Sequence, residues 1–159
     1  MARKIRMTVN GEKRQLEVED NELLAEVLRD NLGLTGVKMG CESGNCGVCT
    51  IVMEGEAVLS CSILAPQADG SEIITVEGLS KMHEGEGLHP IQEAFIDNHG
   101  VQCGYCTPGF LMSTYALLKE NSNPSEDEIR KAVAGNLCRC TGYDKIIKSI
   151  KSASEMMDG

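Results

Sequence analysis

The sequence predicts an α+β protein in which a small β-rich domain is followed by a helical domain. Before residue 79, short alternating apolar segments are separated by hairpin-type turns. After residue 89, apolar residues recur at helical spacing in four segments. The eight cysteines divide between the same two parts, four in each. We therefore expect domains at residues 1–78 and 90–159, joined by a polar, glycine-containing linker at residues 79–89.

The β-rich part shows strand patterns on either side of one helix. Asn10-Gly11 and Glu54-Gly55 read as two-residue hairpin turns. The helix should be capped by Asp20 or Asn21 and end at Gly33. A mostly β domain with one helix packed across its sheet corresponds to a β-grasp fold. The expected strands are residues 4–9, 12–18, 50–53, 56–60 and 73–76.

The helical part should form a four-helix bundle of short helices. Proline suits the first helical position, which places one start at Pro90 and another near Thr107. Ser125 with Glu128 three residues later forms a capping box, which starts a third helix. The fourth should begin near Thr141.

The first cysteine group lies in the stretch GCESGNCGVC, residues 40–49. Cys41, Cys46 and Cys49 have the spacing C-x4-C-x2-C, and Cys61 follows as a later single cysteine. This is the plant-type spacing for a 2Fe-2S cluster. The glycines in the stretch allow the positive φ angles that a tightly curled ligand loop needs.

The turn at Glu54-Gly55 also predicts where the fourth cysteine of this group lies. If the turn has two residues, Met53 pairs with Glu56, and Cys49 then falls opposite Ser60. Cys61 should therefore lie beside Cys49, at the mouth of the cysteine loop.

The second cysteine group comprises Cys103 and Cys106, spaced C-x2-C, and Cys138 and Cys140, spaced C-x-C. Each pair precedes a predicted helix start, where backbone N–H groups stabilise negative charge. Four thiolates here suit either iron or a structural zinc ion. A thioredoxin-like dithiol at Cys103 and Cys106 is a further alternative, but it leaves the other two cysteines unexplained.

Composition limits the cellular compartments and the classes of binding partner that the chain could have. The amino terminus has no apolar run long enough for a signal peptide, and no stretch approaches the length of a membrane helix, so a cytoplasmic protein is expected. Thiols stay reduced there, which favours metal ligands over disulfides. The net charge is −9 and no basic stripe is present, which excludes a nucleic-acid binder. The three histidines lack partners at ligand spacing, so surface or capping roles are expected.

The stretches GCESGNCGVCT, VQCGYCTPGF and NLCRCTGY, in this order, resemble the small iron–sulfur subunit of molybdenum hydroxylases, a family that includes xanthine, carbon monoxide and nicotinate dehydrogenases and aldehyde oxidoreductases. The resemblance covers nearly the whole chain. It implies one 2Fe-2S cluster in a plant-type ferredoxin domain and a second in the helical domain. It also implies that Gln102 and Cys140 approach a molybdopterin, as the cytosine dinucleotide or a related form, held by another subunit. The implied cluster ligands are Cys41, Cys46, Cys49 and Cys61 for the first, and Cys103, Cys106, Cys138 and Cys140 for the second.

The resemblance further implies the direction of electron flow. A large molybdopterin-binding subunit would hydroxylate its substrate, and the electrons would pass through the helical-domain cluster and then the plant-type cluster to an FAD-binding subunit. The chain has no Rossmann glycine fingerprint and no P-loop, so no flavin, nucleotide or catalytic residue is expected on it. A freestanding ferredoxin-like carrier and a zinc-binding adaptor remain the alternatives.

Overall fold

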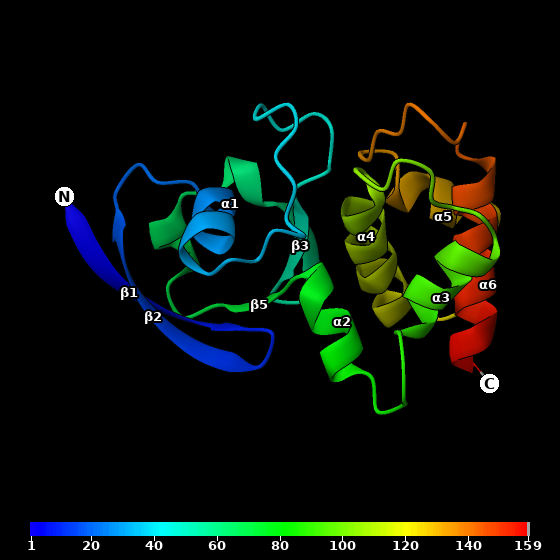
Figure 1. The fold of residues 1–159 in the computed structure, drawn as a ribbon, viewed down its shortest axis with the longest axis horizontal. Helices are drawn as coiled ribbons and strands as arrows, with labels where there is room; N and C mark the ends of the chain where they lie inside the picture. Colours follow the sequence, from blue (N-terminus) through cyan, green and yellow to red (C-terminus); the bar gives the residue numbers. More distant parts are fainter. Residues whose placement is uncertain (159) are drawn as a thin grey trace.

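The structure, a computed structural model, describes residues 1–158 and shows a β-rich part beside a helical part (Figure 1). The β-rich part is a five-stranded sheet with the order β2-β1-β5-β3-β4. β1 and β5 run parallel, and the other neighbours are antiparallel. Every predicted strand is present, although two end before the predicted residues, because Ser60 begins a 3₁₀ turn and Val76 begins a helix. The strands are β1 (Ala2–Val9), β2 (Glu12–Glu19), β3 (Thr50–Met53), β4 (Glu56–Leu59) and β5 (Glu72–Ile74).

Two tight turns form the hairpins, as predicted. The residues of Asn10-Gly11 and of Glu54-Gly55 all have positive φ angles, between 51° and 87°, which suits type I′ turns. In the second hairpin Met53 pairs with Glu56. The N–H of Ser60 donates to the carbonyl of Cys49 at 3.4 Å, so the predicted register is confirmed.

One helical segment packs on the face of the sheet that carries Ile5, Ile51 and Ile73, but it starts at a different residue from the one predicted. α1 (Leu24–Glu26) runs directly into η1, a π-helical turn (Val27–Asn31). Neither Asp20 nor Asn21 caps it. Instead Leu23 is held extended by a bridge to Leu64, and the Glu26 carboxylate accepts from the Leu23 N–H at 3.0 Å. The helix therefore begins at Leu24, directly after the residue that this long-range contact holds extended.

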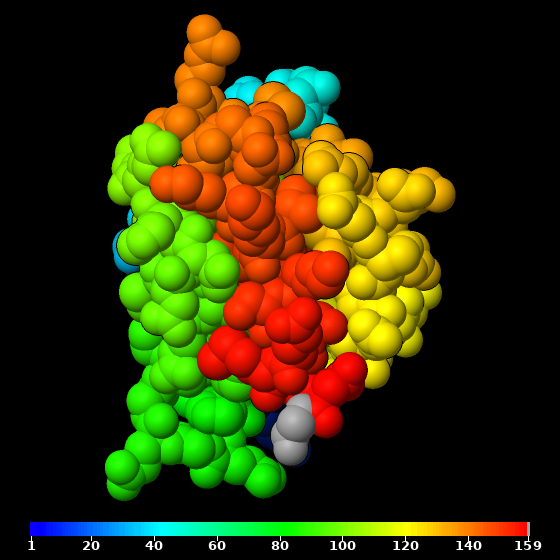
Figure 2. Space-filling view, turned by 90° about the vertical axis from the view of Figure 1, so that its right-hand side faces the viewer, coloured from blue at the N-terminus to red at the C-terminus, as the bar shows by residue number. Residues whose placement is uncertain are grey.

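The helical part contains the four predicted helices, α3 (Pro90–Asp97), α4 (Thr107–Glu120), α5 (Glu126–Ala132) and α6 (Asp144–Asp158). Ser125 caps α5 with Glu128, as its sequence predicts. α6 begins after a turn in which Tyr143 has a φ of 71°, and it lies between α3 and α5 on the face shown in Figure 2. Within residues 1–158, none of the helices combines the length and the apolarity that crossing a bilayer requires.

A further helix, α2 (Val76–Met82), occupies part of the segment for which the sequence predicts a linker. Leu79 anchors it because this side chain is fully buried in the core of the helical part. Two 3₁₀ turns, η2 (Ser60–Ser62) and η3 (Ala65–Ala68), connect β4 to β5.

Successive side chains of β3 point to opposite faces of the sheet, so this strand contributes to the cores of both parts. Ile51 faces the core under α1, whereas its neighbour Val52 faces the core formed by the helices. α1 thus lies on one face of the sheet, and α4 of the helical part packs on the other face at β3 and β4.

His89 caps α3 with a buried side chain. Its Nδ1 accepts from the Ile91 N–H at 3.2 Å, and the Gln92 side chain accepts from the His89 N–H at 3.1 Å. Burial, followed by the nearby charges of His83 and Lys119, lowers the pKa of His89. A capping role is what the sequence predicts for a histidine without ligand partners.

We expect the free energy of unfolding to fall as the pH is lowered through the ordinary histidine pKa of about 6.5. The folded pKa is depressed, so between it and about 6.5 the unfolded chain binds more protons, and stability rises with pH in that window. His89→Asn keeps a capping acceptor without titrating, and should remove this contribution. Denaturant unfolding of both proteins between about pH 5 and 7.5 measures it; identical pH slopes would contradict the assignment.

Candidate functional site

The first cysteine loop and the two loops that precede α4 and α6 lie at the same end of the molecule, uppermost in Figure 1, and Cys61 lies in η2. In the first group, the outer members are Cys41, which is exposed, and Cys46, which is half-buried. The backbone N–H of each residue donates to the sulfur of the other: the Cys46 N–H to Cys41 Sγ at 3.3 Å, and the Cys41 N–H to Cys46 Sγ at 3.4 Å. The two side chains therefore form a pair.

Backbone N–H groups surround the Cys41 sulfur. The N–H groups of Ser43 and Asn45 donate to it at 3.5 and 3.3 Å, in addition to that of Cys46. These bonds lower the pKa of Cys41 to about 6, with the Ser43 and Asn45 N–H groups contributing most. The loop is therefore a nest for a thiolate, built by residues with positive φ such as Gly44.

Cys49 and Cys61 form the inner pair of the first group. Both are buried, and the hairpin register brings them together as predicted. Burial raises the pKa of Cys49 to about 11, and its interaction with Cys61 contributes to the shift. Cys49 therefore stays an unreactive thiol unless a bound cation stabilises its thiolate.

The second group is also organised as two pairs, each drawn from both loops. Cys103 and Cys140 are exposed, and their sulfurs lie 3.6 Å apart. Cys106 and Cys138 are half-buried, and the pKa of Cys106 is raised to about 12 by burial and by the adjacent Cys138. Although burial opposes it, hydrogen bonds from the Thr141 side chain and N–H lower the pKa of Cys138.

These pairs fit a two-iron cluster at each site. Two thiolates on one tetrahedral metal at about 2.3 Å lie about 3.8 Å apart, close to the 3.6 Å between Cys103 and Cys140 and far beyond a disulfide bond. A two-iron cluster takes two thiolates at each iron, which corresponds to the pairing of the cysteines. The sulfur of Cys103 lies beside that of Cys140, on the other loop, whereas a dithiol would pair it with Cys106.

Gln102 and Cys140 lie together at the exposed edge of the second site. The Gln102 Nε2 donates to the Cys140 carbonyl at 3.2 Å, and both residues are exposed. The Gln102 side chain thus keeps its carbonyl oxygen and a second N–H available for another molecule.

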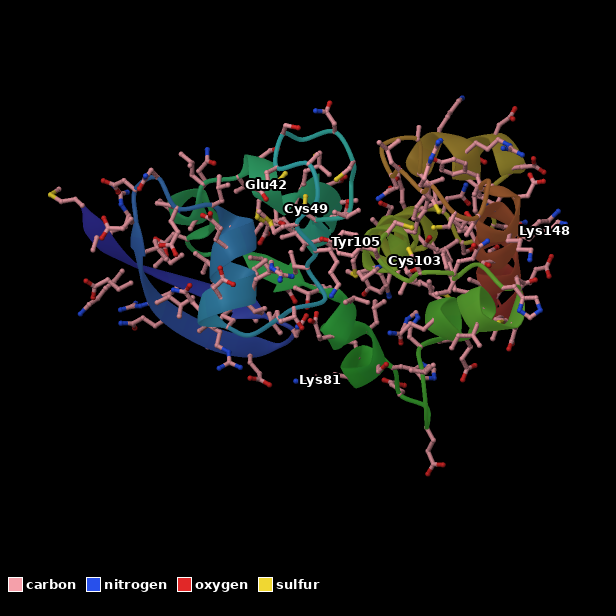
Figure 3. All side chains as sticks on the ribbon, turned by 45° about the horizontal axis from the view of Figure 1, so that its top comes forward. Glu42, Cys49, Lys81, Cys103, Tyr105 and Lys148 are labelled. Carbon is pink, nitrogen blue, oxygen red and sulfur yellow. The ribbon has the colours of Figure 1, made fainter. Side chains whose placement is uncertain are left out.

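Three hydrogen bonds connect the two cysteine groups. The Leu137 N–H donates to the Cys46 carbonyl at 2.9 Å, the Asn136 side chain donates to the Gly47 carbonyl at 3.0 Å, and the Tyr105 hydroxyl donates to the Met39 carbonyl. Figure 3 shows Tyr105 where the β-rich and helical parts meet. The sequence does not reveal these roles of Asn136 and Tyr105, because contacts between distant loops leave no local pattern.

The sequence is similar to known iron–sulfur proteins along nearly the whole chain. Residues 7–79 match the model of a 2Fe-2S iron-sulfur cluster binding domain, and residues 75–151 match that of a [2Fe-2S] binding domain. The nicotine 6-hydroxylase small subunit of Paenarthrobacter nicotinovorans is 51% identical over 94% of this chain and 88% of its own length. The nicotinate dehydrogenase small FeS subunit of Eubacterium barkeri is 46% identical over 95% and 94%, respectively.

A solved structure shares the whole fold. The matching chain of quinoline 2-oxidoreductase from Pseudomonas putida 86 superposes with a TM-score of 0.92 at 46% identity, covering 99% of this chain and 96% of that one. The order of the two domains and their mutual packing are therefore those of a known oxidoreductase component.

In the folded, cluster-free chain at about pH 7, we expect Cys41 to be alkylated at least about tenfold faster than Cys49 or Cys106. Cys41, with a pKa of about 6, is mostly thiolate at that pH, whereas the other two, with pKa values of about 11 and 12, are thiols. Peptide mass spectrometry after timed iodoacetamide treatment measures the rates. Urea unfolding is the control, because it should equalise them; equal rates before unfolding would refute the prediction.

Proposed function

We propose that the two cysteine groups hold two 2Fe-2S clusters in series. The chain belongs to the family of small iron–sulfur subunits of molybdenum hydroxylases, which supports this proposal. The subunit serves electron transfer within an oxidoreductase complex. Each cluster, when bound, supplies a one-electron redox centre. The observation that carries the proposal is the arrangement of eight cysteines as four pairs.

Each iron would take one pair of thiolates. The first cluster would bind Cys41 with Cys46 at one iron and Cys49 with Cys61 at the other. The second would bind the two pairs of the helical part, Cys103 with Cys140 and Cys106 with Cys138. Backbone donors to the sulfurs, such as those around Cys41, would stabilise the anionic cluster and help to set its reduction potential.

We propose that the helical-domain site faces the subunit that holds molybdopterin, as a cytosine dinucleotide or a related form. Gln102 and Cys140 are the residues that would approach the pterin, since both are exposed and the Gln102 amide is oriented by the Cys140 carbonyl. A pterin has a ring edge of donors and acceptors that an amide can match.

The surface around this site supports a protein partner. Val101, Tyr105 and Leu137 flank its cysteines and are 38%, 49% and 52% exposed. Apolar side chains that gather on one surface mark an interface. We therefore place the large subunit against this end of the helical part.

The first site has different surroundings, and we propose that it faces the FAD-binding subunit, which accepts the electrons. Polar residues surround Cys41, among them the exposed Glu42, Ser43 and Asn45. Polar surroundings suit association that is guided by charge and hydrogen bonds.

We propose domains at residues 1–78 and 90–159, with residues 79–89, which begin inside α2, between them. We place the complex in the cytoplasm, where thiols stay reduced.

The purified complex should contain about four irons and four sulfides per copy of this chain, and no stoichiometric zinc. Cys49→Ser should remove the plant-type signal from the electron paramagnetic resonance spectrum and spare the other, with about half the iron lost. Cys106→Ser should do the reverse and stop electron flow from molybdenum. Zinc in place of iron, or loss of both signals from either folded variant, would refute two separate clusters.

Leu137→Asp should weaken binding of the molybdopterin subunit by about tenfold or more, because a desolvated charge would replace an apolar contact at the interface. Both cluster signals should remain, since Leu137 binds the first loop through its backbone N–H, which the substitution keeps. Ile96→Asp is the matched control: this side chain is 56% exposed on α3 and flanks no cysteine. Copurification of tagged variants measures the effect, and equal recovery of the large subunit would contradict the docking surface.

A further inference from the structure

Asn136 is a buried amide between the two cysteine groups, only 4% exposed. Its Oδ1 accepts from the Ser113 hydroxyl at 2.8 Å. Its Nδ2 donates to the Gly47 carbonyl at 3.0 Å and lies 3.4 Å from the Thr50 hydroxyl. The side chain thus links α4 of the helical part to the first cysteine loop and to the start of β3, with each of its polar atoms engaged.

The Gly47 carbonyl is held by more than one donor. In addition to Asn136, the Thr50 N–H donates to it at 3.2 Å and the Thr50 hydroxyl at 2.6 Å. Gly47 lies between the ligands Cys46 and Cys49 and has a φ of 73°. These bonds therefore fix the orientation of a peptide group in the middle of the ligand loop.

The backbone next to Asn136 holds the preceding carbonyl of the same loop. Leu137 N–H donates to the Cys46 carbonyl at 2.9 Å, and the next residue is the ligand Cys138. Two consecutive carbonyls of the first loop, those of Cys46 and Gly47, are thus bound by two consecutive residues that lead into the second site.

Glycines bring the two parts into backbone contact at this point. A Cβ on Gly109, in the first turn of α4, would overlap the Gly47 carbonyl and press on the Val48 Cα. A Cβ on Gly47 would overlap the Gly135 carbonyl. No side chain separates the loops here, so their spacing depends on the backbone contact and on the amide that bridges it.

We propose that Asn136 is a positioning residue that sets the separation and orientation of the two ligand loops, and hence the electronic coupling between the clusters they hold; this inference rests on the proposed function. The position requires one acceptor and two donors on a short side chain, which an asparagine amide provides. Aspartate has the same shape but faces the Gly47 carbonyl with an acceptor, and so repels it. Electron tunnelling falls steeply with distance, so a small displacement of the loops has a large effect.

Asn136→Asp in the purified complex tests the inference. After full reduction, wild-type clusters should show splitting of their electron paramagnetic resonance signals by mutual magnetic interaction, which falls steeply with distance. In the variant both signals should remain, their splitting should decrease, and electron exchange between the clusters should slow by about tenfold or more, the order expected when reacting groups are displaced. Rapid freezing after a limited pulse of reductant measures the exchange.

Gly109→Ala moves the same loops apart without changing a polar group, and should reduce the splitting in the same direction. Gly135→Ala is its matched control, because a Cβ there meets nothing within 4 Å and should leave the splitting unchanged. Ser154→Ala is the control for Asn136, since it removes the hydrogen bond of a buried side chain, to the Ser122 carbonyl, within the helical part alone.

The outcomes separate this inference from the proposed function. Wild-type complex without two cluster signals would refute the proposed function itself. Two wild-type signals with unchanged splitting and exchange in Gly109→Ala and in folded Asn136→Asp would overturn only the positioning role. An equal effect in Ser154→Ala would overturn it as well, because the change would then reflect lost stability and not the contact between loops.

Discussion

The negative charge of thiolates gathered in short loops is the constraint on which the rest of this structure depends. Four thiolates at one site repel one another, and the chain offsets this repulsion with backbone N–H groups, three of which reach the Cys41 sulfur. The loop must curl for its N–H groups to face inward, which explains the positive φ angles of Glu42, Gly44 and Gly47. Residues committed to this geometry are small or polar and cannot also build an apolar core.

Loops of this kind need support from outside, and each supports the other. The two parts of the chain share a core through Val52 of β3, which packs among residues of the helices. At the top of that contact the backbones meet at Gly47 and Gly109, and Asn136 bridges them. Packing between the domains therefore fixes the geometry of the ligand loops. A substitution that disturbs this packing would alter both sites together.

The features that the sequence predicted are those with local causes. The cysteine spacing and the two-residue turn at Glu54-Gly55 are local, and together they sufficed to place Cys61 beside Cys49. The start of α1 depends on the distant bridge from Leu23 to Leu64, and α2 depends on the burial of Leu79 in another domain. Asn136 was missed for the same reason, since its role lies in a contact 89 residues away along the chain.

Both sites have a more exposed and a more buried pair of cysteines, but the surroundings of the more exposed pairs differ. Under the proposed assignment, the apolar side chains around Cys103 and Cys140 suit a lasting contact with the molybdopterin subunit, in which water is excluded from the path of the electron. Under the same assignment, the exposed polar residues around Cys41 would keep more water near the first site. Water and donor groups stabilise the more negative, reduced form of a cluster, so burial of one site and hydration of the other would bias electrons toward the first. The direction of transfer would then arise from the surfaces that this chain presents to its partners as well as from the order of the two clusters along it.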